Sequence, residues 1–156
     1  MTTTISSASL TVTLTEAITL NGYDKGGSNT LTIASVTEVD NRIVTVPTSE
    51  IEILAFSTAS ASGTYVESNV KYIRITNKDD TNHCALTFKN EDNDEFTIKL
   101  DKGQSFIYNG DLSGGVVDTF DAAATAVTPG TFADLVNVTA LANTADVDLE
   151  ILVALT

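Results

Sequence analysis

The stretch VDLEILVAL, residues 147–155, contains the clearest strand pattern in the chain. Every second residue is large and aliphatic, and successive side chains of a strand point to opposite faces, so one face of this segment is entirely apolar. The other face carries Asp148 and Glu150 but continues with Leu152 and Ala154. A strand that is apolar on both faces is either central in a sheet or covered by another subunit. The sequence leaves both interpretations open.

The same alternation recurs upstream in short segments, at 10–15, 31–39, 43–46, 51–55, 70–76, 84–88, 96–100, 105–108 and 132–139. Nine or ten short strands separated by turn residues are typical of a sandwich or a barrel. No long amphipathic helix pattern is present, which argues against βαβ units. We therefore expect an all-β, antiparallel β-sandwich of jelly-roll type, with at most one short helix in the Ala-rich stretch 118–128.

Turn residues suggest how the strands connect. Asn21-Gly22 tolerates positive φ and predicts a tight turn. Asp40-Asn41 predicts a second turn, just after a break in the alternation at Ala34-Ser35. Residues 70–108 contain four strand segments with short polar connections, which predicts a four-stranded antiparallel meander.

The chain has 156 residues, a usual size for one domain that folds without disulfides or metals. No fixed-period repeat and no interdomain linker is visible. Residues 1–9 are rich in Thr and Ser and predict an extended N-terminal arm that orders on contact with a partner. The sandwich domain is expected to span residues 10–156.

Charge and composition narrow the possible partners. The formal net charge is −13, which repels nucleic acid and anionic membranes, so neither is an expected partner. No signal peptide is recognisable, and the longest apolar stretches are too short to span a bilayer. A soluble protein made in a cytoplasm is therefore expected. The single cysteine rules out an intrachain disulfide.

The residues that most enzymes need are scarce. His83 and Cys84 are the only histidine and cysteine, and as neighbours on a strand their side chains diverge, so neither a thiolate–imidazole pair nor a common zinc site is expected. No Gly-x-Ser-x-Gly motif is present. Carboxylate pairs alone permit glycoside hydrolysis, but the chain has no Trp for a sugar platform. We expect no enzyme activity and no catalytic, cofactor-binding or metal-binding residues.

Two other features are candidate binding sites. The acidic run 91–95 supplies oxygen ligands but lacks EF-hand spacing, so it is interpreted as a solvated hairpin tip without calcium. Tyr65, Tyr72 and Tyr108 are either surface aromatics for a partner or core residues with one wet end, and the sequence does not decide between these.

Three segments carry a family resemblance: NVKYIRITNKDDTN (69–82), LTF (86–88) and LDKGQSFIY (100–108). Together they resemble the small β-sandwich virion proteins of tailed bacteriophages, especially marine and cyanobacterial ones. In that group an apolar strand, a polar turn, a second apolar strand and a Gly-x-Ser segment recur in this order. The resemblance covers residues 69–112.

The resemblance implies a place on a virus particle. The expected function is that of a non-enzymatic capsid decoration (cement) protein, which binds the major capsid protein or other virion proteins as a symmetric homo-oligomer, with a trimer as the first expectation. Its expected location is the virion. The alternative is a phage tail, fibre or connector component, or a module that binds carbohydrate on a host surface.

Overall fold

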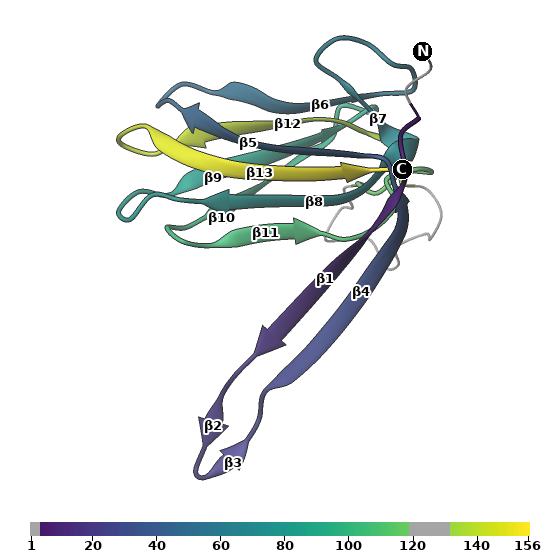
Figure 1. Ribbon diagram of the computed structural model, residues 1–156. Coiled ribbons are helices and arrows are strands. Elements are labelled where there is room, and N and C mark those ends of the chain that lie inside the picture. The colour runs from purple at the N-terminus through teal and green to yellow at the C-terminus, as the bar shows by residue number, and fades with distance from the viewer. Residues whose placement is uncertain (1–3, 119–131) are drawn as a thin grey trace, which may run out of the picture.

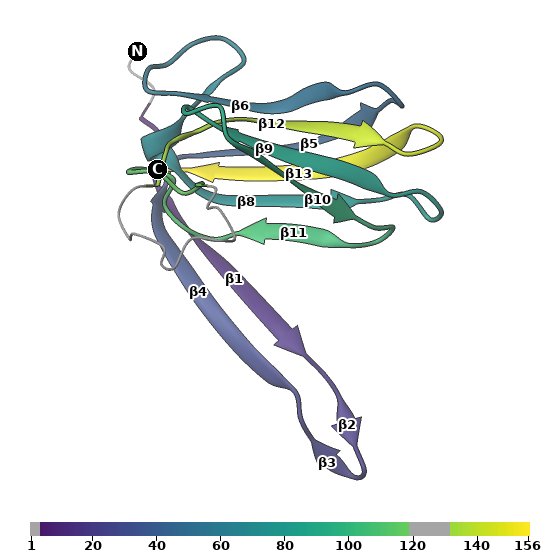
Figure 2. The ribbon, with the colours of Figure 1, turned by 180° about the vertical axis from the view of Figure 1, so that it is seen from behind.

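The computed structural model describes residues 4–118 and 132–156, which form two packed β-sheets and a long hairpin (Figures 1 and 2). The hairpin contains β1 (Ala8–Glu16), β2 (Thr19–Leu20), β3 (Tyr23–Asp24) and β4 (Gly27–Val36). The sandwich contains β5 (Glu38–Val46), β6 (Ile51–Ser57), β7 (Tyr65–Val66), β8 (Val70–Asn77), β9 (Cys84–Asn90), β10 (Glu95–Leu100), β11 (Ser105–Tyr108), β12 (Leu135–Ala142) and β13 (Val147–Leu155). A 3₁₀ turn, η1 (Glu67–Asn69), precedes β8.

The strand order identifies the fold as a jelly roll. One sheet has the order β11-β8-β13-β5 and is called the β13 sheet below; the other has the order β10-β9-β12-β6-β7 and is called the β12 sheet. Apart from the short parallel strand β7, each sheet contains four antiparallel strands. Among these eight strands, β9 and β10 are the only consecutive pair that lies side by side. This arrangement confirms the all-β, jelly-roll-like sandwich expected from the sequence.

The core lies between the two sheets, and β13 supplies its centre. Val147, Leu149, Ile151 and Val153 have no solvent-exposed surface. They belong to one continuous cluster with buried residues of the β12 sheet, such as Leu86. Burial of these aliphatic side chains is the main favourable contribution to folding.

The two interpretations of the last strand are now resolved. β13 is central in its sheet, between β5 and β8, as the first of these interpretations expected. Its second apolar face is also covered, since Ala154 is fully buried. The cover comes from the hairpin of the same chain, whose Val36 packs with Ala154 and Tyr72. Thus the C-terminal part of β13 is covered on both faces in one copy of the protein, whereas Asp148 on the second face is exposed.

Two sequence predictions about connections were wrong. Asp40 and Asn41 do not form a turn but lie inside β5, and the chain changes direction at Thr37, between β4 and β5. Ser35 has a φ of 61°, which accounts for the break in alternation seen in the sequence. The four-stranded meander is also absent, because β8 and β11 belong to one sheet while β9 and β10 belong to the other. The polar turns at 78–83 and 101–104 cross between the sheets instead of continuing one of them.

The hairpin of residues 8–36 stands away from the sandwich, and its tip is far from both sheets (Figures 1 and 2). This projecting element overlaps only the last two residues of the stretch 1–9, in which the sequence predicted an arm. Residues 4–7 are exposed and precede the first strand. Most of the Ala-rich stretch in which a helix was expected lies outside the described residues.

Candidate functional site

The projecting hairpin, residues 8–36, is called the hairpin arm below, and its two faces differ in chemistry. The register pairs Leu10 with Ile33 and Val12 with Leu31, so these side chains share one face. The opposite face consists of Thr and Ser, with hydroxyl–hydroxyl hydrogen bonds of 3.3 Å between Thr13 and Thr30 and 3.2 Å between Thr15 and Ser28. The arm is therefore amphipathic over its proximal part, whereas toward the tip Leu14 lies opposite Asn29 and Glu16 lies opposite Gly27.

The base of the arm is anchored on its own sandwich. The anchoring residues form a second apolar cluster, separate from the main core: Val36, Tyr72 and Ala154 are its buried members, and Leu10, Val12, Ile33 and Leu152 pack against them. The outer face of the β13 sheet thus receives the apolar face of the arm. This contact fixes the direction in which the arm leaves the sandwich.

The distal part of the arm has no such cover. Leu14, Ile18, Leu20 and Tyr23 are each more than half exposed. A two-stranded hairpin without a packed face is only marginally stable in water. Apolar side chains gathered on a projecting element mark an interaction surface more often than scattered apolar residues do. The distal arm is accordingly the strongest candidate for a functional surface.

Turn chemistry shapes the tip. Asn21 and Gly22 both have positive φ, 52° and 82°, as a tight hairpin turn requires. This confirms the turn predicted at Asn21-Gly22. Below it, the Lys25 amide donates to the Ile18 carbonyl at 2.9 Å. Gly26 is needed because a Cβ there would lie 2.1 Å from the Glu16 carbonyl oxygen.

The arm is also nearly free of charge. It carries two acids, Glu16 and Asp24, and one base, Lys25, so it contributes −1 to a chain of −13. Almost all of the negative charge therefore lies elsewhere in the chain. An approach led by the arm meets little electrostatic repulsion from another acidic surface.

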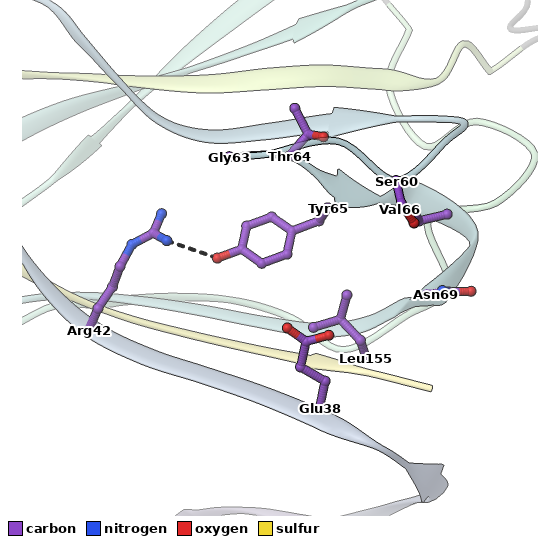
Figure 3. Close-up of a pocket in the computed structure, with 9 residues that line it drawn as sticks. All are labelled: Glu38, Arg42, Ser60, Gly63, Thr64, Tyr65, Val66, Asn69 and Leu155. Carbon is purple, nitrogen blue, oxygen red and sulfur yellow. Dashed lines mark hydrogen bonds between the residues drawn. The ribbon is translucent and has the colours of Figure 1, made fainter. Parts of the chain in front are cut away.

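A polar cleft of about 260 Å³ opens at the end of the sandwich near β7 (Figure 3). Tyr65 points its ring across this cleft toward Arg42, and Glu38 lies beside Leu155. Arg42 donates to Tyr65 Oη at 2.9 Å, to Asp40 Oδ2 at 2.8 Å and to the Ile53 carbonyl at 2.6 Å. The Tyr65 hydroxyl in turn donates to Asp40.

These hydrogen bonds connect the two sheets across the cleft. Arg42 and Asp40 belong to β5, whereas Ile53 and Tyr65 belong to the β12 sheet. Both terminal nitrogens of the Arg42 guanidinium already donate hydrogen bonds, and the lining residues include no imidazole or thiol. Burial, followed by the hydrogen bond to Asp40, raises the pKa of Tyr65 to about 12. A phenol with this pKa stays neutral and is a poor proton-transfer group near neutral pH.

Replacing Tyr65 by Phe tests whether the hydrogen bonds of its hydroxyl stabilise the fold. We expect Tyr65→Phe to lower the free energy of unfolding by about 1–2 kcal/mol near neutral pH, because two hydrogen bonds are lost. The pKa of Tyr65 is near 10 when unfolded and about 12 when folded, so its contribution is complete below pH 10 and is lost between pH 10 and 12. The difference between wild type and variant in urea unfolding should therefore shrink across this window. Tyr23→Phe, at the exposed arm tip, serves as the control and should show no such trend.

Cys84, His83 and the acidic run 91–95, which the sequence offered as candidate site residues, do not form a common site in the described part of the chain. Cys84 is fully buried, and burial raises the pKa of its thiol. His83 precedes it at the edge of the turn, where its carbonyl accepts from the Asn143 amide at 3.2 Å. The run 91–95 is a hairpin tip between β9 and β10, with Asn93 at a φ of 64°. Within residues 4–118 and 132–156, no three His, Cys, Asp or Glu side chains are grouped to hold a metal ion.

The three tyrosines all pack against apolar clusters, Tyr65 and Tyr108 against the main core and Tyr72 in the second cluster. Tyr72 is buried under the arm, and Tyr65 is half-buried in the cleft. Tyr108 is half-buried and donates from its hydroxyl to the Asp111 carbonyl at 3.2 Å. The exposed aromatic of the candidate surface is Tyr23, which the sequence did not single out. Its position beside Asn21-Gly22, with Ile18 and Leu20 before the turn, was the available signal.

Comparison with known proteins adds no family to this description. The sequence matches no protein-family model and no curated protein. In the described part of the chain, no helix has the length and apolar character needed to cross a membrane.

Proposed function

We propose that this protein is a non-enzymatic virion structural protein, a capsid decoration protein that binds the shell surface as a symmetric oligomer. The observation that carries the proposal is the hairpin arm, which holds Leu14, Ile18, Leu20 and Tyr23 out in solvent. Removing these apolar side chains from water lowers the free energy, and contact with a partner surface removes them from water. The partner proposed here is the major capsid protein or another virion protein.

The remainder of the molecule suits this role. The jelly-roll core provides a rigid base, and the polar cleft at Arg42 and Tyr65 is occupied by its own hydrogen bonds. A net charge of −13 keeps a densely packed array of copies soluble. The likeness of residues 69–112 to phage β-sandwich proteins supports the same assignment.

The test is the protein composition of purified particles. Virus particles are isolated on a density gradient from the culture or sample that carries the gene, and their proteins are quantified by mass spectrometry. We expect peptides of this chain in a fixed ratio to the major capsid protein, and a labelled antibody should decorate the shell in electron micrographs. Peptides confined to the particle-free fraction contradict the proposal. Label confined to tails or fibres assigns the alternative location and contradicts capsid decoration.

A further inference from the structure

We propose that the distal hairpin arm of one copy covers the outer face of the β13 sheet in a second copy of this chain, at Val39 and Ile43 on β5. The copies would thereby join head to tail. This inference deepens the proposed assembly role and rests on it only in treating the arm as an assembly element. Both contacting surfaces belong to this chain: the distal arm of one copy and the outer face of β5 in the other.

The receiving surface is a part of the outer face of the β13 sheet that the arm of the same copy does not cover. On β5, Val39 pairs with Ala154 and Ile43 pairs with Glu150, so both side chains point away from the core. Val39 is 55% exposed and Ile43 is 65% exposed. These two large apolar side chains form an exposed patch on one edge strand, with Asn41 between them on the same face.

This sheet face already accepts the arm in each copy. Next to the patch, Ala154 and Tyr72 are buried under Leu10, Val12 and Ile33 from the base of the arm. Beyond the base, Leu14 continues this face opposite Asn29, and at the tip the exposed Leu20 and Tyr23 pair with each other. A second copy therefore offers the distal arm the same kind of surface that the base already occupies.

The arm extends beyond one edge of its own sheet, where a second copy can meet it. A groove of about 320 Å³ lies between the arm and the sheet, lined by Leu14 and Leu31 on one side and by Tyr72 and Ile107 on the other. Ile107 belongs to β11, which forms one edge of the β13 sheet, while β5 forms the other edge. The arm then continues past β11 into solvent (Figures 1 and 2). A second copy placed with its β5 edge beside this β11 edge brings Val39 and Ile43 under the distal arm.

Charge favours this contact between two acidic chains. The arm contributes only −1, so it is a segment that approaches another copy with little repulsion. At the receiving face, the carboxylate of Glu150 beside Ile43 is paired with Arg74 and lies 3.8 Å from Lys78 Nζ. The acid next to the patch is thus neutralised within its own copy.

The contact joins two different surfaces, so it is heterologous. Head-to-tail contacts of this kind form a closed ring when the rotation between copies closes, and an open filament when it does not. A ring of three copies agrees with the trimer expected from the sequence. The native mass of the purified protein gives the number directly.

Matched single substitutions test both surfaces. Val39→Asp places a charge on the receiving patch, and Leu14→Asp places one on the apolar face of the arm. Each should weaken self-association by more than about tenfold, because a charge would be buried without a partner. Native mass spectrometry and light scattering over a dilution series should show a multiple of 16.4 kDa for the wild type and a 16.4 kDa species for the two variants.

Two controls add the same charge elsewhere. Val136→Asp alters an exposed valine on the β12 sheet, and Thr15→Asp alters the Thr face of the arm next to Leu14. Both should keep the wild-type mass. Circular dichroism verifies that each variant is folded. A wild type that stays monomeric at every concentration overturns the proposal, and so does equal dissociation by the control substitutions.

A cross-link gives an independent reading that needs no disruptive charge. Leu20→Cys and Ile43→Cys are made in separate chains, mixed and oxidised. We expect a disulfide-linked pair containing one chain of each type, while mixing Leu20→Cys with Val136→Cys should give none. Failure to form the first pair in an oligomeric protein overturns the assigned contact. Particle binding is measured separately, so loss of this contact and loss of the virion assignment remain distinguishable.

Discussion

Leu149→Ala is expected to lower the free energy of unfolding by about 3–5 kcal/mol. Leu149 lies in the middle of β13, has no exposed surface and belongs to the cluster that joins both sheets. Its truncation removes buried methyl groups and leaves a cavity that close-packed neighbours fill only in part. For a domain whose total stability is about 5–15 kcal/mol, this is a large share.

The measurement is urea unfolding followed by far-ultraviolet circular dichroism, since the chain contains no Trp to serve as a fluorescent probe. The melting temperature should fall by roughly 10 °C. Leu141→Ala is the matched control, because Leu141 is 39% exposed on β12. It should cost less than about 1 kcal/mol. Equal losses from the two leucines would show that β13 is not the centre of the core.

The β-sandwich could be predicted because alternation reports burial directly. The pattern of residues 147–155 marked β13 with its bounds as observed, since one face of that strand meets the core at every second residue. Short strands and the lack of a helical period then fixed the fold class. These signals are local, and each depends on a few adjacent residues.

Sheet membership could not be predicted in the same way. A polar turn such as 78–83 has the same composition whether it closes a hairpin or crosses between sheets, so the segment 70–108 was wrongly interpreted as a meander. The Asp40-Asn41 prediction failed for a related reason. Asp40 points toward Tyr65 and Arg42, where hydrogen bonds across the sandwich outweigh its usual preference for turns.

The hairpin arm was visible in the sequence only as ordinary strands. Leu10, Val12 and Leu14 alternate with Thr just as the residues of a half-buried strand do. Nothing in that alternation states whether the apolar face meets the core of the same chain or remains open. The exposed positions Leu14 and Tyr23 are known only once the arm is seen to leave the sandwich.

Asn77 links the two crossing turns that the sequence assigned to a meander, through both its side chain and its backbone. Asn77 is fully buried at the end of β8, and its side-chain amide donates to the Asn82 carbonyl at 2.9 Å and to the Leu100 carbonyl at 3.2 Å. Its Oδ1 accepts from the Asp79 amide at 2.9 Å. The Asn77 backbone also bonds to Gly103 and Gln104. Asn77 therefore forms hydrogen bonds with both turns, at 78–83 and at 101–104.

Asn77→Asp should consequently be far more harmful than its size suggests. The change keeps the acceptor for Asp79 but turns an oxygen toward the Asn82 and Leu100 carbonyls, which have lost their donor. We expect a loss of about 3 kcal/mol or more near neutral pH, because a buried charge and an unsatisfied carbonyl are created together. Asn143→Asp, on an exposed turn, is the matched control and should change stability by less than about 0.5 kcal/mol.

The pH dependence of this variant provides the sharper signature. Burial beside two carbonyl oxygens raises the pKa of the introduced carboxyl in the folded state above its unfolded value. A group of this kind favours folding below its unfolded pKa and loses that contribution as the pH rises through its folded pKa. The stability deficit relative to the wild type, measured by urea unfolding at matched pH values, should thus shrink on acidification. A deficit that stays constant with pH would mean that Asn77 acts by shape alone, and that its donated hydrogen bonds do not hold the crossing turns.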